Sequence, residues 1–130
     1  MKVEKTINIC GMDVRMRYCA AAETGYETLS GKSAAVFAPI EVKDEEGNST
    51  GWEVKAVFDD YIRLAVAAVI AAYSSSDAKP PISVDDVLFE ATPQDVSALV
   101  EAVIELRKEW YQVPAVVKPE GEENKDEKNA

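Results

Sequence analysis

Gly31-Lys32-Ser33 is the run of this sequence that comes nearest to a nucleotide-binding motif, because a phosphate-binding P-loop ends in these residue types. A complete P-loop has another glycine five residues before Gly31, and this chain has Tyr26 there. The motif also requires a preceding buried strand, so that backbone N–H groups converge on phosphate. Residues 20–30 instead contain helix formers, and Gly31 stands where a glycine commonly ends a helix. The run therefore predicts a helix terminus and no nucleotide site.

The chain contains no histidine, so the usual general base, the partner of a nucleophilic serine and the commonest metal ligand are absent. Carboxylates cluster at Asp44-Glu45-Glu46, Asp59-Asp60 and Asp85-Asp86. The two Asp pairs stand at expected helix starts, where the helix dipole favours negative charge. The first cluster lies in a turn-rich stretch, and no cluster has the spacing of a calcium-binding loop. We therefore expect a protein that is not an enzyme, with no catalytic, cofactor-binding or metal-binding residues.

Cys10 and Cys19 are the two cysteines, which are too few for a zinc site of four ligands. They lie on segments that we expect to pair as strands, so a disulfide between them is one interpretation. Two reduced, partly buried thiols are the other and the simpler interpretation.

The formal net charge of −10 is spread along the chain. Residues 1–117 carry 19 acids and 11 bases, a net charge of −8, and residues 118–130 carry 5 acids and 3 bases, a net charge of −2. Such a surface repels polyanions, so we expect neither nucleic acid nor an anionic membrane as a partner. The simplest role of the acidity is to keep the protein soluble.

Targeting and membrane segments are not expected. The first residues, MKVEKTINIC, lack the apolar run and the small-residue cleavage site of a signal peptide. The most apolar stretch, residues 64–72, is much shorter than the roughly 20 residues that span a bilayer. We therefore expect a cytoplasmic protein.

With 130 residues, of which 47% are hydrophobic, the chain is long enough for one domain with its own core. Alternating apolar residues over 3–9 and 14–18, separated by a turn that contains Gly11, predict an N-terminal β-hairpin. Helix formers over 20–30 and a further short turn over 32–37 follow.

Residues 39–55 admit two interpretations. Ile40 and Val42 could pair with Trp52 and Val54 as a β-ribbon across the turn-rich DEEGNSTG. The same segment could equally be a plain surface loop.

Three helices are expected in the second half of the chain. Residues 61–73 carry a single charge, Arg63, so this helix must be buried on nearly all sides at the centre of the core. Ser83 and Thr92 precede two further helices as N-caps, and Pro93 takes the favoured first position of the second. This last helix carries one apolar stripe at three- and four-residue spacing.

An apolar strip ends that helix and continues beyond it: Trp110, Tyr111, Val113, Val116 and Val117. Because Trp and Tyr are favoured anchors of protein interfaces, these five are the candidate partner-binding residues. The alternative is that the strip folds back and completes the core. The polar, charged segment that follows predicts a disordered tail.

The predicted architecture is therefore α+β. An N-terminal β-hairpin is packed against about four helices in a single domain over residues 1–117, and residues 118–130 form a disordered acidic tail.

A hairpin with an arginine-bearing second strand, VRMRY, leads to AAETGYETLSGKS over residues 21–33. An apolar Ala/Val/Ile helix from Asp60 and a capped final helix from Thr92 follow. This order of segments resembles that of the tail assembly chaperones of long-tailed bacteriophages, and YETLSGKS is similar to their aromatic-Glu-x-x-Gly-Lys-Ser segment. The resemblance covers residues 7–110 and leaves residues 39–56 unmatched.

The resemblance implies a non-catalytic factor of virion assembly, in the cytoplasm of a bacterial host. Such a factor would bind the helical tape measure protein, keep it soluble and help to recruit tail tube subunits, and would be absent from the finished particle. A rival interpretation is a small structural tail or head-tail connector component of a phage or prophage, which purified particles would contain.

Overall fold

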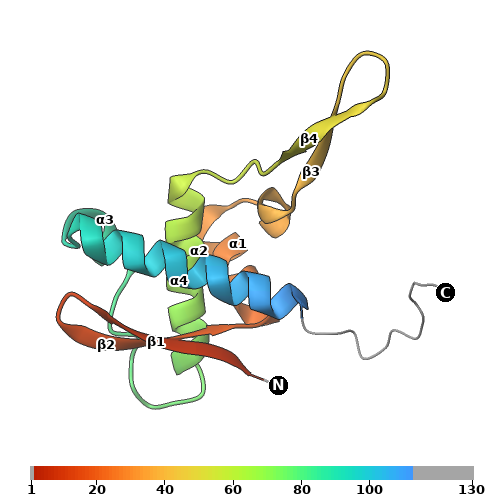
Figure 1. Ribbon diagram of the computed structural model, residues 1–130. Coiled ribbons are helices and arrows are strands. Elements are labelled where there is room, and N and C mark those ends of the chain that lie inside the picture. Colours follow the sequence, from red (N-terminus) through yellow and green to blue (C-terminus); the bar gives the residue numbers. More distant parts are fainter. Residues whose placement is uncertain (1, 113–130) are drawn as a thin grey trace.

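The computed structural model describes residues 2–112, which form short strands and helices around one core. In chain order the elements are β1 (Val3–Ile9), β2 (Met12–Tyr18), α1 (Ala20–Ser30), the 3-10 helix η1 (Ala34–Phe37), β3 (Ile40–Lys43), β4 (Ser49–Glu53), α2 (Phe58–Tyr73), α3 (Val84–Phe89) and α4 (Pro93–Gln112). This is the α+β class that the sequence predicts (Figure 1). The predicted tail over 118–130 lies outside the described residues.

The N-terminal hairpin forms as its alternating pattern predicts. β1 and β2 pair antiparallel, with Val3 opposite Tyr18. The turn between them puts Cys10 (φ 54°) and Gly11 (φ 77°) in the left-handed region, which a tight two-residue turn requires and which glycine adopts without strain. One face of the hairpin packs on α2 and α4 and is buried: Val3, Ile9, Val14, Met16 and Tyr18.

The same hairpin keeps the two cysteines apart. Cys10 is exposed in the turn, whereas Cys19 follows the end of β2 and is half-buried. The whole strand ladder separates the two residues, and both are free thiols. The prediction of two unpaired thiols is confirmed and the disulfide interpretation is wrong, but the expected partial burial holds for Cys19 alone, because Cys10 stands in the exposed turn.

α2 is the centre of the fold, as its nearly uninterrupted apolar sequence predicts. Ten of its sixteen residues are buried, and α1, β2 and α4 all pack against it (Figure 1). The approach of α1 is especially close, because a Cβ added at Gly25 would stand 3.3 Å from the Cβ of Ala67. By propensity alone Gly25 weakens α1 by about 1 kcal/mol relative to alanine. Its role is to let the two helices approach.

Local caps set where α3 and α4 begin. Ser83 Oγ accepts from the N–H of Asp86 at 3.2 Å, and the Asp86 carboxylate accepts from the N–H of Ser83 at 2.9 Å. Thr92 and Asp95 exchange the same two hydrogen bonds at 3.2 and 3.3 Å. Both predicted N-caps are therefore confirmed. One stripe of α4 is buried against the hairpin and α2: Leu99, Ala102, Val103 and Leu106.

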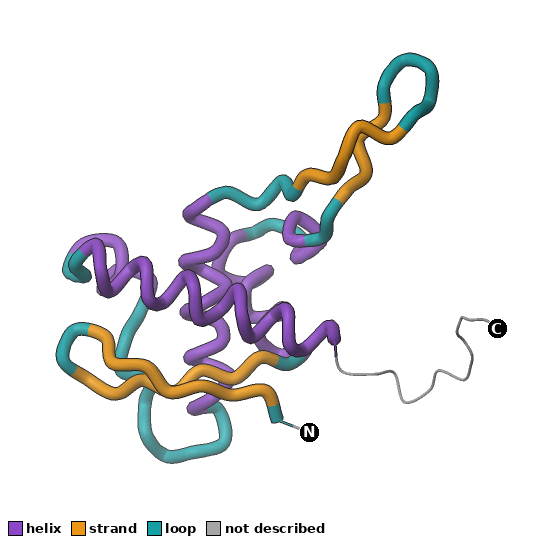
Figure 2. Tube along the Cα trace, in the orientation of Figure 1, coloured by secondary structure: helices purple, strands orange, loops and turns teal. Residues whose placement is uncertain are grey.

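Residues 40–53 form a β-ribbon, and the loop interpretation of this segment is wrong. β3 and β4 pair antiparallel into a sheet of their own, which extends away from the helical body (Figure 2). The register differs from the predicted pairing, because Trp52 lies opposite Glu41 and Ile40 lies opposite Glu53. A β-bulge between Val42 and Lys43 shifts the pairing of the two strands. The alternation of apolar residues does not predict this bulge.

We expect Gly25→Leu to lower the free energy of unfolding by about 1–3 kcal/mol, because the new side chain would have to fit between α1 and α2. Ala21→Leu is the matched control. Ala21 is exposed on the same helix, so this variant should stay within about 0.5 kcal/mol of the wild type. Urea unfolding followed by circular dichroism measures both variants. Equal stability of the two would contradict a close contact at Gly25.

Candidate protein-binding groove

Gly31, Lys32 and Ser33 each have a structural role. Gly31 (φ 73°) ends α1, and its N–H donates back to a carbonyl oxygen of the last helical turn at 2.9 Å. The hydroxyl of Ser33 accepts from the N–H of Ala35 at 3.1 Å and caps η1. The ammonium of Lys32 lies 3.1 Å from the carboxylate of Asp60. The prediction that this run ends a helix is confirmed.

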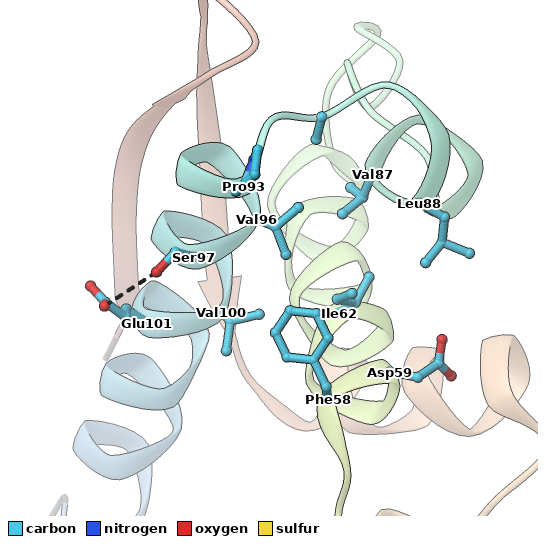
Figure 3. Close-up of a pocket in the computed structure, with 11 residues that line it drawn as sticks. Phe58, Asp59, Ile62, Val87, Leu88, Pro93, Val96, Ser97, Val100 and Glu101 are labelled. Carbon is cyan, nitrogen blue, oxygen red and sulfur yellow. Dashed lines mark hydrogen bonds between the residues drawn. The ribbon is translucent and has the colours of Figure 1, made fainter.

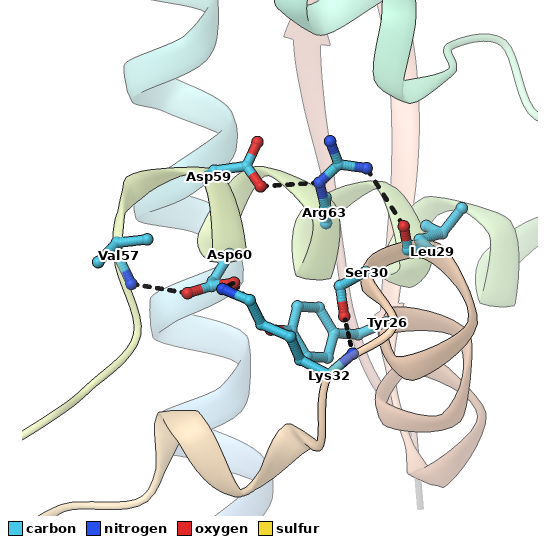
Figure 4. A network of polar contacts seen from close by, with 8 residues as sticks. All are labelled: Tyr26, Leu29, Ser30, Lys32, Val57, Asp59, Asp60 and Arg63. Carbon is cyan, nitrogen blue, oxygen red and sulfur yellow. Dashed lines mark hydrogen bonds and ion pairs between the residues drawn. The ribbon is translucent and has the colours of Figure 1, made fainter.

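Lys32 belongs to a network centred on Asp60, which is only 1% exposed (Figure 4). The carboxylate accepts from the Tyr26 hydroxyl at 2.9 Å, the Lys32 ammonium at 3.1 Å and the Val57 N–H at 2.8 Å. Burial by itself raises the pKa of Asp60, but these three donors together outweigh burial and hold the pKa below its usual value. The charged carboxylate therefore ties the end of α1 to the start of α2.

The neighbouring Asp59 has a different role, although both residues stand in the first turn of α2. Asp59 is exposed and forms an ion pair with Arg63 one turn later, at 2.8 Å. Arg63 also donates to the carbonyl oxygen of Leu29 at 3.2 Å, which adds a second link between α1 and α2 (Figure 4). Of the two carboxylates expected at this helix start, Asp60 is the buried cap and Asp59 is the surface charge.

The structure describes two of the five predicted partner-binding residues. Trp110 is half-buried and packs against the core. Tyr111 is exposed, and its hydroxyl donates to the Glu23 carboxylate at 2.7 Å, which attaches the end of α4 to α1. Trp110 thus has a packing role, and Tyr111 remains on the surface. The other three residues lie outside the described part of the chain: Val113, Val116 and Val117.

An apolar groove of about 700 Å³ opens between the start of α2, α3 and the first half of α4 (Figure 3). Phe58 and Leu88 line it and are 61% and 41% exposed. Large apolar side chains left in water around one hollow are typical of a surface that a partner covers. The remaining wall is mainly aliphatic: Ile62, Val87, Val96 and Val100.

The groove depends on the short helix α3. Val87 is buried, and Leu88 and Phe89 follow it at once. Because successive helical residues point about 100° apart, these three side chains cannot all reach the core, and the last two stay exposed. Sequence reasoning missed the groove. This run of three apolar residues in a short capped segment was the available signal.

The rim of the groove is negative. Its two charged lining residues are Asp59, which is paired with Arg63, and Glu101, and the protein as a whole carries a net charge of −10. The Ser97 hydroxyl also lies at the rim, where it makes one long hydrogen bond of 3.5 Å to Glu101 (Figure 3). An apolar hollow with a negative rim complements an apolar segment flanked by lysine or arginine.

The chain matches no protein-family model, and comparisons with characterised proteins and with solved structures find no similar protein. Within residues 2–112, no helix is long and apolar enough to cross a membrane. Over the same residues, no group of three or more cysteine and carboxylate side chains is placed to hold a metal ion.

We expect Asp60→Ala to lower the free energy of unfolding by about 2–4 kcal/mol, because the Tyr26 hydroxyl and the Val57 N–H lose their acceptor. Asp59→Ala is the matched control, one residue away. It removes only an exposed ion pair and should cost less than about 1 kcal/mol. Urea unfolding at pH 7 compares the two variants, and a larger loss in Asp59→Ala would contradict the role of Asp60.

The contribution of Asp60 should depend on pH in one direction. Because its pKa is lower in the folded than in the unfolded protein, its stabilisation is complete above the unfolded value of about 4 and is lost as the pH falls through the folded value. The difference in unfolding free energy between the wild type and Asp60→Asn should therefore be largest near neutral pH and shrink below about pH 4. A difference that grew on acidification would show the opposite linkage.

Proposed function

We propose that the protein is a non-catalytic binding protein that covers an apolar helical segment of its partner, and that it serves as a tail assembly chaperone of a phage or prophage. The apolar groove between α2, α3 and α4 is the observation that carries the proposal, because the exposed side chains of Phe58 and Leu88 line one hollow, and apolar surface gathered in this way is typical of a surface that a partner covers.

The dimensions of the groove suit a helix. The lining residues of α4 run from Pro93 to Glu101, which is about 12 Å at 1.5 Å per residue, or roughly two helical turns. A partner helix would present apolar residues at three- and four-residue spacing to such a groove. The acidic rim favours a partner helix with basic residues beside its apolar face.

The order of elements supports the assignment to phage tail assembly. The chain has the hairpin, an α1 that ends at Gly31, the apolar α2 and an α4 capped by Thr92, which are the segments on which the resemblance to tail assembly chaperones rests. The proposed partner is the helical tape measure protein, with tail tube subunits as a second partner. The proposed location is the cytoplasm of the bacterial host.

Co-expression should raise the soluble yield of the tape measure protein from the same phage or prophage genome, and the two proteins should co-purify. Leu88→Asp should weaken the complex tenfold or more, because it puts an unpaired charge into the apolar contact. Ile70→Asp is the matched control, since Ile70 is also an exposed aliphatic residue of a helix, at 39% against 41% for Leu88, and it does not line this groove.

Three results would count against the proposal. If the partner's yield did not change and no complex were recovered, the chaperone function would be wrong. If both variants weakened the complex equally, binding would not be located in the groove. If the protein were found in purified particles, the structural tail or connector role would replace it.

A further inference from the structure

The β-ribbon of residues 40–53, here called the arm, is a second surface without a partner. Within the described residues, β3 and β4 pair only with each other, so each has one free edge. The arm points away from the helices (Figures 1 and 2). An isolated two-stranded ribbon is marginally stable in water, and its free N–H and C=O groups are a template for a further strand.

The arm is held firmly at its base. The N–H of Ala56 donates to the carbonyl oxygen of Val36 at 2.9 Å. This hydrogen bond joins the segment that enters the arm to the segment that leaves it. Phe37 is buried there between two aromatic rings, with centroid distances of 4.8 Å to Tyr26 and 5.1 Å to Tyr61. The direction of the arm is therefore set by core packing.

The tip of the arm is also a defined structure. The carboxylate of Asp44 accepts from the N–H groups of Glu46 and Asn48, both at 2.9 Å. Gly47 has a φ of 84°, which closes the turn. The ribbon thus has its own turn and an anchored base.

Trp52 is the conspicuous side chain of the arm, because it is 67% exposed near the end of β4. Ile40, on the opposite face of the ribbon, and Val54, just after β4, are also exposed. Tryptophan is strongly enriched among residues that dominate binding energy, and here it contributes nothing to the core.

The charge of the arm indicates what it can accept. Residues 40–55 carry five carboxylates and two lysines, a net charge of −3. A second copy of the arm would bring the same charge, and three exposed apolar side chains are too few for the roughly 1,200 Å² that a stable interface buries. Charged strand edges discourage self-pairing, so the surface selects a strand of opposite charge.

We propose that the arm binds an extended, lysine- or arginine-bearing segment of the partner protein as a third strand along the free edge of β4. Backbone hydrogen bonds would provide affinity, and Trp52 and Glu53 would contact the apolar and basic side chains of the added strand. This inference rests on the proposed function, since the segment belongs to the same partner whose helix occupies the groove. The protein would then hold its partner at two places.

The test uses the full chain with Trp110→Phe, so that Trp52 is the one tryptophan of this protein, and the co-expressed tape measure protein as the partner, whose own emission is subtracted. Formation of the complex should shift the Trp52 emission to shorter wavelength. Trp52→Ala and Glu53→Lys should each weaken binding tenfold or more and leave thermal stability unchanged, because neither side chain packs in the core. Glu109→Lys, the same charge change at an exposed site of α4, should bind like the wild type.

The outcomes separate the arm from the groove. In one outcome the complex forms and Leu88→Asp weakens it, but the emission of Trp52 does not shift and Trp52→Ala binds the partner as tightly as the wild type. The arm inference is then wrong and the proposed function stands. If no complex forms, both are wrong. If the protein alone has twice its mass of 14.2 kDa in solution and Trp52→Ala restores the monomer, a second copy occupies the arm and the inference is overturned.

Discussion

Burial of α2 is the constraint on which the remaining structure depends. A helix that is apolar around nearly its whole circumference has no side that can face water, so α1, the hairpin and α4 pack on it from different directions. Among the described residues, Asp60 is the one charged side chain that is buried with it. Its position in the first turn makes this tolerable, because the N–H of Val57 at the helix start and the side chains of Tyr26 and Lys32, at and just after the end of α1, supply its hydrogen bonds.

The two proposed binding surfaces both begin where this helix begins. The arm returns to the body at Ala56, and Phe58 opens the groove two residues later. The Asp60 network holds the segment between them through the N–H of Val57. One buried carboxylate therefore anchors the short segment that joins the two surfaces. A net charge of −10 favours the solubility of a chain that exposes Phe58, Leu88 and Trp52, and it disfavours contacts between copies of the same surface.

Much of the fold could be predicted because its signals are local. The caps at Ser83 and Thr92 act on backbone groups three residues away, and Gly31 acts on the turn before it. Other features depend on residues far apart in the chain. Lys32 and Asp60 are 28 residues apart, and the sequence around either residue does not predict their ion pair. The groove brings together α2, α3 and α4, so sequence reasoning treated Val96 and Val100 as ordinary members of an apolar stripe.

The sequence by itself determined the α+β class, the hairpin, the buried central helix and the starts of α3 and α4, because backbone propensity, periodicity and capping act within one or two helical turns. Only the tertiary structure decided that Asp60 is buried and Asp59 exposed, that Gly25 allows a close helix contact, and that residues 40–53 extend as an arm. It also decided which apolar residues remain uncovered. Whether an apolar residue is covered depends on how much space the other elements leave once they have packed on α2. The order of residue types along the chain does not predict that space.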